Sequence, residues 1–181
     1  MADVDFAEKV FPRWIGSLAG DVRTLAAVVA RDDVPRRLRS PLVGALNYLF
    51  RALDIIPDWF QGLGFVDDAM VLRVGASLAA AEEAGGAAGL DGLYKLGNDA
   101  DLVKDVLGDE LDARFLKYVE DLSSKEVRGR SADTVFRAPD QLKDFLAEVD
   151  AFAADYKPAA YEPNDRYPEK LRQFMNDKLP R

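Results

Sequence analysis

The feature that most constrains this chain is the spacing of its apolar residues. Between Val22 and Val29 they recur at intervals of three and four, which places them on one face of a helix. A second apolar face runs from Leu38 to Leu53, and residues 138–156 carry the cleanest amphipathic pattern. No stretch alternates apolar and polar residues as a half-buried strand would. The sequence therefore predicts an all-α fold.

The chain has 181 residues, of which 49% are hydrophobic, so it can bury one core and is not intrinsically disordered. It contains no cysteine and no histidine. This excludes disulfides, a thiolate nucleophile and the commonest zinc ligands. Any catalysis would have to use Asp, Glu, Lys, Tyr, Ser or a hard metal ion, and we therefore lean against an enzyme.

Turn and cap signals divide the chain into three parts. Residues 1–86 form a helical domain built on a helical hairpin, whose second helix we expect from residue 68 to 84, capped by Asp67 and ended by Gly85. The first helix of the hairpin begins or bends at Ser40 and Pro41. We predict that residues 87–156 are an acidic helical extension packed on this core, with Asp99 as a further helix cap. Residues 157–181 would be an extended arm and a short C-terminal helix.

Residues 53–68, LDIIPDWFQGLGFVDD, connect the two helices of the predicted hairpin, and we call them the acidic elbow. They place four carboxylates among apolar residues and glycine. A bare buried carboxylate is costly, so each must cap a helix, pair with a cation or bind a ligand. The four carboxylates belong to Asp54, Asp58, Asp67 and Asp68.

The elbow resembles the signature of the YkvA-like family, a small helical domain of unknown function found mainly in bacteria. The match comprises DIIPD at residues 54–58, Gly64, an aromatic and an apolar residue, and the paired Asp67 and Asp68. The resemblance covers residues 22–84. The sequence departs from the family pattern at Ala52 and Gln61, where proline is common. The helix before the elbow is also less apolar than in members expected to insert into membranes.

The elbow carboxylates have two readings. In the first they are architectural, with Asp54 and Asp67 accepting free N–H groups at turns and Asp58 pairing with Arg51 or Arg73. In the second, Asp54, Asp58, Asp67 and Asp68 converge and hold a hard cation, Mg²⁺ or Ca²⁺, because clustered carboxylates repel one another unless a cation or proton intervenes. Apart from this metal, the sequence suggests no cofactor.

The net charge is −8, which argues against a nucleic-acid partner. A local excess of arginine nevertheless precedes the elbow, and Arg36, Arg37 and Arg39 could contact an anion or an anionic membrane surface. Charged residues interrupt the most apolar window, so we expect no membrane span. The acidic N-terminal residues do not resemble a secretory signal, and we expect a cytoplasmic protein.

The leading interpretation is a non-catalytic scaffold or protein-interaction module with a protein partner. The alternatives are a Mg²⁺- or Ca²⁺-binding protein, or a metal-dependent hydrolase, that uses the acidic elbow, and a peripheral membrane-binding protein.

Overall fold

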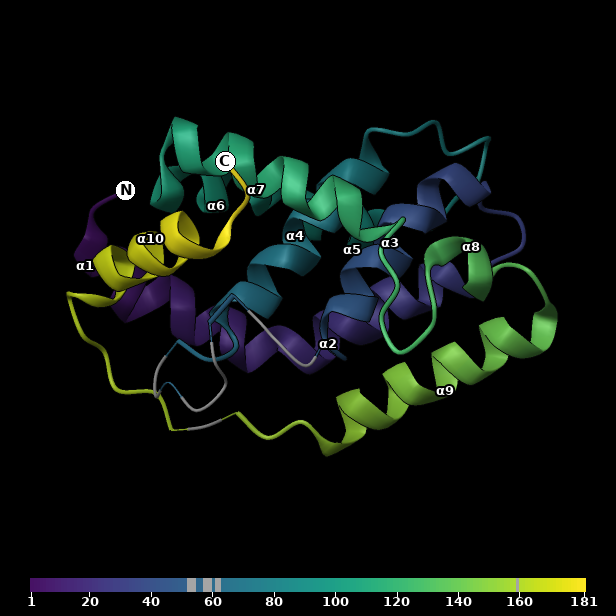
Figure 1. The fold of residues 1–181 in the computed structure, drawn as a ribbon. Coiled ribbons are helices and arrows are strands. Elements are labelled where there is room, and N and C mark those ends of the chain that lie inside the picture. The colour runs from purple at the N-terminus through teal and green to yellow at the C-terminus, as the bar shows by residue number, and fades with distance from the viewer. Residues whose placement is uncertain (52–54, 57–59, 61–62, 159) are drawn as a thin grey trace.

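A computed structural model describes the chain except residues 52–54, 57–59, 61–62 and 159. The described residues form helices and no strand, which confirms the all-α prediction (Figure 1). The elements are α1 (Asp3–Asp5), the π-helical turn η1 (Phe6–Val10), α2 (Phe11–Val29), α3 (Arg36–Tyr48), α4 (Val66–Ala80), α5 (Asp91–Asn98), α6 (Ala100–Leu107), α7 (Asp109–Leu122), α8 (Ala132–Val135), α9 (Pro139–Asp155) and α10 (Tyr167–Lys178).

The predicted hairpin is formed by α3 and α4, and glycine lets the two helices approach closely. A Cβ atom built on Gly75 of α4 would lie 2.5 Å from the Cβ atom of Ala45 on α3, closer than real Cβ atoms come. Gly44 on α3 meets the backbone of Ser123, just after α7, in the same way, at 2.6 Å from its nitrogen. The hairpin is therefore held between neighbours that leave no room for side chains at these positions.

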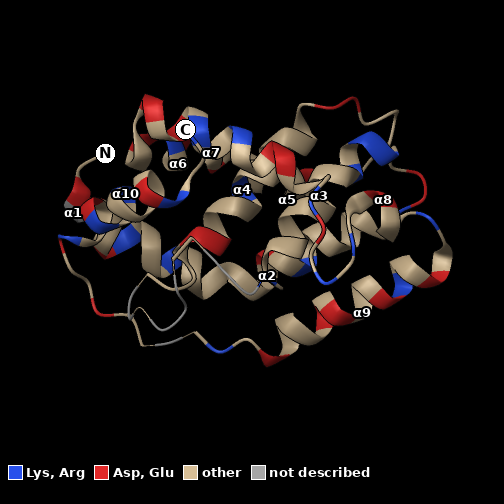
Figure 2. Cartoon of the chain, viewed as in Figure 1, with Lys and Arg blue, Asp and Glu red and all other residues tan. Residues whose placement is uncertain are grey.

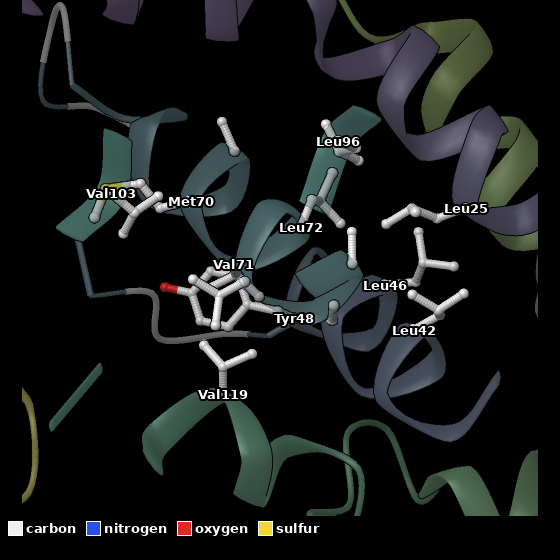
Figure 3. Close-up of a cluster of buried hydrophobic side chains, with 14 of the residues drawn as sticks. Leu25, Leu42, Leu46, Tyr48, Met70, Val71, Leu72, Leu96, Val103 and Val119 are labelled. Atoms are coloured by element: carbon white, nitrogen blue, oxygen red, sulfur yellow. The ribbon is translucent and has the colours of Figure 1, made fainter. Parts of the chain in front are cut away.

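One hydrophobic core joins the helices from η1 to α10. Figure 3 shows its central part, where side chains from α2, α3, α4, α5, α6 and α7 meet around Tyr48 and Leu72. The α10 helix docks on this core through Leu171 and Met175, which are both fully buried. Docking supplies the stability that a helix of this length lacks by itself.

The α9 helix lies along α2 in the opposite direction. The Arg23 guanidinium of α2 donates a hydrogen bond to the carbonyl oxygen of Ala153 at 3.0 Å, near the end of α9. Just beyond α9, the Tyr156 hydroxyl donates to the carbonyl oxygen of Ile15 at 2.9 Å. These bonds fix the C-terminal end of α9 beside the first half of α2.

Several predicted boundaries need correction. The α3 helix begins at Arg36, so Pro41 lies inside it, and α4 runs only from Val66 to Ala80. The first ten residues are mostly helical. None of the helices in the described part of the chain combines the length and hydropathy needed to cross a membrane. The three-part division of the chain stays a prediction.

Candidate functional site

Asp67 is the centre of a buried hydrogen-bond network at the elbow. It lies in the first turn of α4 and is fully buried. Its Oδ2 atom accepts hydrogen bonds from the Tyr48 hydroxyl at 2.5 Å and from the Ile56 backbone amide at 3.0 Å. The Tyr48 hydroxyl in turn accepts a bond from the Ile55 amide at 2.8 Å. Tyr48 and Asp67 together hold two consecutive amides of the elbow against the hairpin.

The electrostatics of this network keep the Tyr48 phenol protonated. Burial is the main reason that the pKa of Tyr48 is raised well above its ordinary value, and the negative charges of Asp67 and Asp68 raise it further. Tyr118, whose ring centre is 6.3 Å from that of Tyr48, acts in the same direction. A protonated phenol can donate to Asp67 and accept from Ile55 at the same time.

The prediction that Asp67 caps α4 is wrong. The helix begins two residues earlier than expected, Phe65 occupies the N-cap position, and no side chain there accepts a hydrogen bond from the first turn. Asp67 lies within that turn, and its Oδ2 atom faces Tyr48 and Ile56. Asp99 likewise lies at the N-cap of α6 without a capping bond, because its carboxylate faces Arg13 and Arg73.

The structure describes only two residues of the predicted four-carboxylate cluster, Asp67 and Asp68. Asp54 and Asp58 lie outside the described residues. Asp67 and Asp68 are adjacent, and Asp68 is 4% exposed. Within the part of the chain that the structure describes, no three carboxylates gather as metal ligands. A cation site at all four positions stays a prediction.

A buried cation on α4, Arg73, was predicted only as an alternative partner for Asp58. It is 2% exposed, and Nη2 lies 3.1 Å from Oδ2 of Asp21, while Nε lies 3.4 Å from Oδ2 of Asp99. Its guanidinium carbon stands 4.8 Å from the centre of the Trp14 ring. Burial lowers the pKa of Arg73, and the two carboxylates oppose that shift. The sequence signal was a lone cation in the otherwise apolar stretch 69–80.

A groove of about 850 Å³ lies between α9 and the ends of α3 and α4 that face the elbow. We call it the aromatic groove. Two edge-to-face ring pairs line it, Phe50 with Phe152 at 6.1 Å and Phe65 with Tyr156 at 5.2 Å between ring centres. The sequence analysis did not single out this groove, although Phe152 and Tyr156 stand one turn apart. Its remaining lining residues are Leu49, Arg128, Arg130, Glu148, Ala151, Asp155 and Lys157.

The predicted arginine patch is divided by the structure. Arg37 turns to the end of α4, where it donates to the Glu83 carbonyl oxygen at 3.1 Å and lies 3.5 Å from the Glu82 carboxylate. Arg36 and Arg39 line a different cavity, of about 480 Å³, with residues from the start of α9. Figure 2 shows the basic residues at the start of α3 and on the connection between α8 and α9.

Comparison with known families gives one result. A family model described as a protein of unknown function (DUF1232) matches residues 41–73. This segment runs from α3 through the elbow into α4, so it contains both Tyr48 and Asp67. It supports a small domain of unknown function there, over a shorter range than the resemblance to the YkvA-like family, and that family name stays an interpretation. Neither a curated protein nor a solved structure matches the chain.

Proposed function

We propose that this chain is a non-catalytic interaction module. In this proposal the α3–α4 hairpin is the scaffold, and the aromatic groove receives an apolar helical segment of a protein partner. The observation that carries the proposal is the pairing of four aromatic rings in one groove of about 850 Å³, contributed by α9 and by residues beside α3, α4 and α9. Aromatic side chains are the residues most enriched at the centres of protein interfaces.

The rim of the groove favours a partner with apolar anchors at its centre. Arg130 forms a two-pronged pair with Glu148, with nitrogen to oxygen distances of 2.8 and 2.7 Å, and Arg128 lies over the Phe50 ring. Asp155 and Lys157 add exposed charge at one end. An apolar centre inside a polar rim is the usual anatomy of an interface, and an amphipathic helix meets such a groove with side chains spaced three and four residues apart.

The non-catalytic part of the proposal draws on how the elbow uses its polar groups. Oδ2 of Asp67 accepts bonds from Tyr48 and Ile56, so this atom has a structural task. The Tyr48 hydroxyl serves the same task through Ile55. Groups that are committed to holding backbone amides are poor candidates for moving protons during a reaction, since each change of protonation would break the support.

A selection experiment with matched variants tests the groove. Peptides would be selected from a random helical library against the full chain, and binding would be measured by fluorescence anisotropy. Ala151 and Ala154 are both exposed on α9, but only Ala151 lines the groove. We expect Leu-, Phe- or Trp-rich peptides whose affinity falls at least about tenfold in Ala151→Arg, because the new side chain fills the groove.

The control variant Ala154→Arg adds the same charge to the same helix and should change affinity by less than about twofold. Melting curves of both variants should match the parent, because both positions are exposed. Failure to enrich any peptide would refute the proposal, and so would equal binding by Ala151→Arg and the parent.

A second candidate function is a hard-cation site formed by Asp54, Asp58, Asp67 and Asp68. The observation that favours it is the negative potential at the start of α4, where Asp67 and Asp68 are buried side by side and both raise the pKa of Tyr48. A cation would relieve the repulsion between such carboxylates, and Mg²⁺ or Ca²⁺ suits an all-oxygen ligand set. Calorimetric titration with each ion would test it, with Asp68→Asn as the variant. A flat trace at millimolar metal rules it out.

We also infer, from the elbow motif and the charge pattern, that the elbow is of the YkvA-like kind and that the protein acts in the cytoplasm. Peripheral membrane contact through Arg36, Arg37 and Arg39 is the weaker alternative, since Arg37 turns towards Glu82 and away from the cavity that Arg36 and Arg39 line. Fractionation of cells that express the tagged full chain would test the location. Recovery in the membrane fraction at high salt would contradict it.

A further inference from the structure

The cavity between the start of α3 and the start of α9 is basic on an acidic protein, and we call it the basic cavity. Four cationic side chains line it, those of Arg36, Arg39, Arg137 and Lys143. The only carboxylate among the lining residues that the structure describes is Asp32, whose side chain is 98% exposed. The whole chain carries a net charge of −8, so this concentration of positive charge runs against the average of the molecule.

The cations of this cavity are poorly neutralised by the protein. The Arg39 side chain is only 12% exposed. Among the residues that the structure describes, its nearest carboxylate oxygen, on Asp32, is 3.8 Å away, and its buried Nε atom has no hydrogen-bond acceptor. Its Nη1 atom donates to the carbonyl oxygen of Val29, the last residue of α2, at 3.2 Å. A mostly buried guanidinium without a close counter-ion carries a desolvation cost that a bound anion would offset.

Two of the guanidinium groups share one aromatic ring. Their central carbons lie 5.4 Å (Arg36) and 4.9 Å (Arg39) from the centre of the Phe136 ring. The two charges are therefore within roughly 10 Å of each other, about one Debye length at 0.1 M salt, and they repel. Arg36 also pairs with Asp133 at 2.7 Å, but that carboxylate is 87% exposed, and such surface pairs contribute little and exchange easily.

The other two cations, Arg137 and Lys143, lie at the start of α9. Within the described part of the chain, the side chains of Arg137 and Lys143 form neither an ion pair nor a hydrogen bond. Both are exposed, and both stand at the start of α9, whose N-cap residue, Ala138, provides no side-chain acceptor. The positive end of that helix dipole adds to their charge. Positive charge from the start of α3 and from the start of α9 thus lines the same basic cavity.

The remaining wall of the basic cavity is apolar. Phe136, Leu142 and Leu146 line it together with small residues, and all three are partly buried against the core. A volume of about 480 Å³ is within the range of small-molecule sites. It exceeds the space that an inorganic anion needs, so an anion alone would leave the apolar wall without a contact.

We propose that the basic cavity binds a phosphate monoester that carries an apolar group. The phosphate would lie among Arg36, Arg39, Arg137 and Lys143, where bidentate arginine contacts are available, and the apolar group would lie on Leu142 and Leu146. The source is either a free metabolite or the headgroup region of an anionic lipid, which present the same chemistry. This site is separate from the aromatic groove and does not depend on the function proposed for that groove.

Calorimetry on the full chain at constant ionic strength, with inorganic phosphate and octyl phosphate as probes, tests the proposal. We expect octyl phosphate to bind at least about tenfold more tightly than inorganic phosphate, because its chain buries apolar surface. In the double variant Arg137→Gln/Lys143→Gln its affinity should fall at least about tenfold. The control Arg37→Gln removes an arginine from the same helix as Arg36 but outside the cavity, and should change affinity less than about twofold.

A second arm separates the two sources. Flotation with phosphatidylcholine vesicles, with and without phosphatidic acid, would be measured for the parent and the same variants. Binding to the acidic vesicles that is lost in the double variant and kept in Arg37→Gln indicates a lipid headgroup, and octyl phosphate binding without flotation indicates a free metabolite. Both results support the site.

Three results would overturn the proposal. They are no binding of either probe at millimolar concentration together with no flotation, equal binding by the double variant and the parent, and equal loss in the double variant and in Arg37→Gln. Equal affinity for the two probes would remove the apolar part of the assignment. Melting curves of the variants should match the parent, because Arg137 and Lys143 are exposed.

Discussion

Among the buried charged residues of α4, Asp67 and Arg73 have opposite signs and are held in different ways. Asp67 in the first turn accepts bonds from neutral donors, the Tyr48 hydroxyl and the Ile56 amide. Arg73, two turns later, is held by carboxylates, Asp21 from α2 and Asp99 from the junction of α5 and α6. The acid therefore fixes the path of the chain between the two helices of the hairpin. The base ties the hairpin to the helices around it.

The comparison shows what a buried charge can do for a helical fold. A carboxylate accepts bonds only, so it can collect amides of a segment that has no regular structure of its own. A guanidinium has five donors in a fixed fork and can reach several elements at once. Asp67 thus specifies a local conformation, whereas Arg73 specifies how helices pack.

The largest effect should come from removing Arg73. Arg73→Ala takes the cation from the partly buried Asp21, leaves Asp99 with Arg13 alone and opens a hollow against Trp14. We therefore expect a loss of about 3–5 kcal/mol in the free energy of unfolding. Chemical denaturation of the full chain measures it. Arg73→Met, which keeps the volume, should lose less. Equal losses in the two variants would show that the hollow contributes nothing and that the lost charge pairing accounts for the whole effect.

The next largest effect should come from Asp67→Ala. It leaves the Tyr48 hydroxyl and the Ile56 amide without Oδ2 as their acceptor, and a loss of about 2–4 kcal/mol is expected, at about 1–2 kcal/mol for each buried donor. Hydrogen exchange should show faster exchange at Ile56, with little change in the first turn of α4. A helix-capping role predicts the reverse pattern, so exchange that accelerates only in α4 would contradict the elbow network.

The sequence contained part of this arrangement. The hairpin was predictable, because small residues around Gly75 indicate a close contact between helices. The importance of Asp67 was predictable because it is a carboxylate among apolar residues. The hydrogen-bond partner of Asp67, Tyr48, was not predictable. Rules for helix caps consider only neighbouring residues, whereas Tyr48 lies nineteen positions before Asp67. A tyrosine in an apolar helical pattern is assigned to the hydrophobic core, and only the structure shows which groups its hydroxyl bonds.

The partners of Arg73 and the lining of the cavities were harder still to predict. Arg73 meets Asp21 across fifty-two positions, and only the packing of α4 against α2 brings them together. Arg36 and Arg39 were predicted as an anion patch with Arg37. Helical spacing alone would have placed Arg37 on a different face from Arg36 and Arg39. Arg137 and Lys143 come from a segment about one hundred residues later, and no local sequence pattern links that segment to α3.

A smaller effect, with a distinct dependence on pH, is expected for Tyr48→Phe. The variant keeps the ring but leaves the Ile55 amide without its acceptor, for a loss of about 1–3 kcal/mol at neutral pH. Because the pKa of Tyr48 is raised in the folded state, the unfolded chain loses this proton first as the pH rises above about 10, and stability falls from there upward.

The alkaline loss identifies the phenol. Tyr156 and Tyr161 also have raised pKa values, so the parent and the variant should both lose stability at high pH. The variant should lose less per pH unit, by up to about 1.4 kcal/mol for the missing group. Denaturation series from pH 8 to about 11 measure the two slopes. Parallel slopes would contradict the placement of Tyr48 beside Asp67 and Asp68.

The smallest effect expected is the coupling between the two charges themselves. Asp67 and Arg73 are about 9 Å apart along the helix axis, at a rise of about 1.5 Å per residue. Besides burial, the groups that shift the pKa of Tyr48 are Asp67, Asp68 and Tyr118, and those that shift the pKa of Arg73 are Asp21 and Asp99. Among the groups that the structure describes in these two roles, none is common to both networks. Sites without shared partners at this separation usually add to within about 0.5 kcal/mol. A double-mutant cycle of Asp67→Asn and Arg73→Met should therefore close to within that limit. A larger coupling would mean that α4 transmits strain from one network to the other. Asp67 and Arg73 would then not contribute independently to stability.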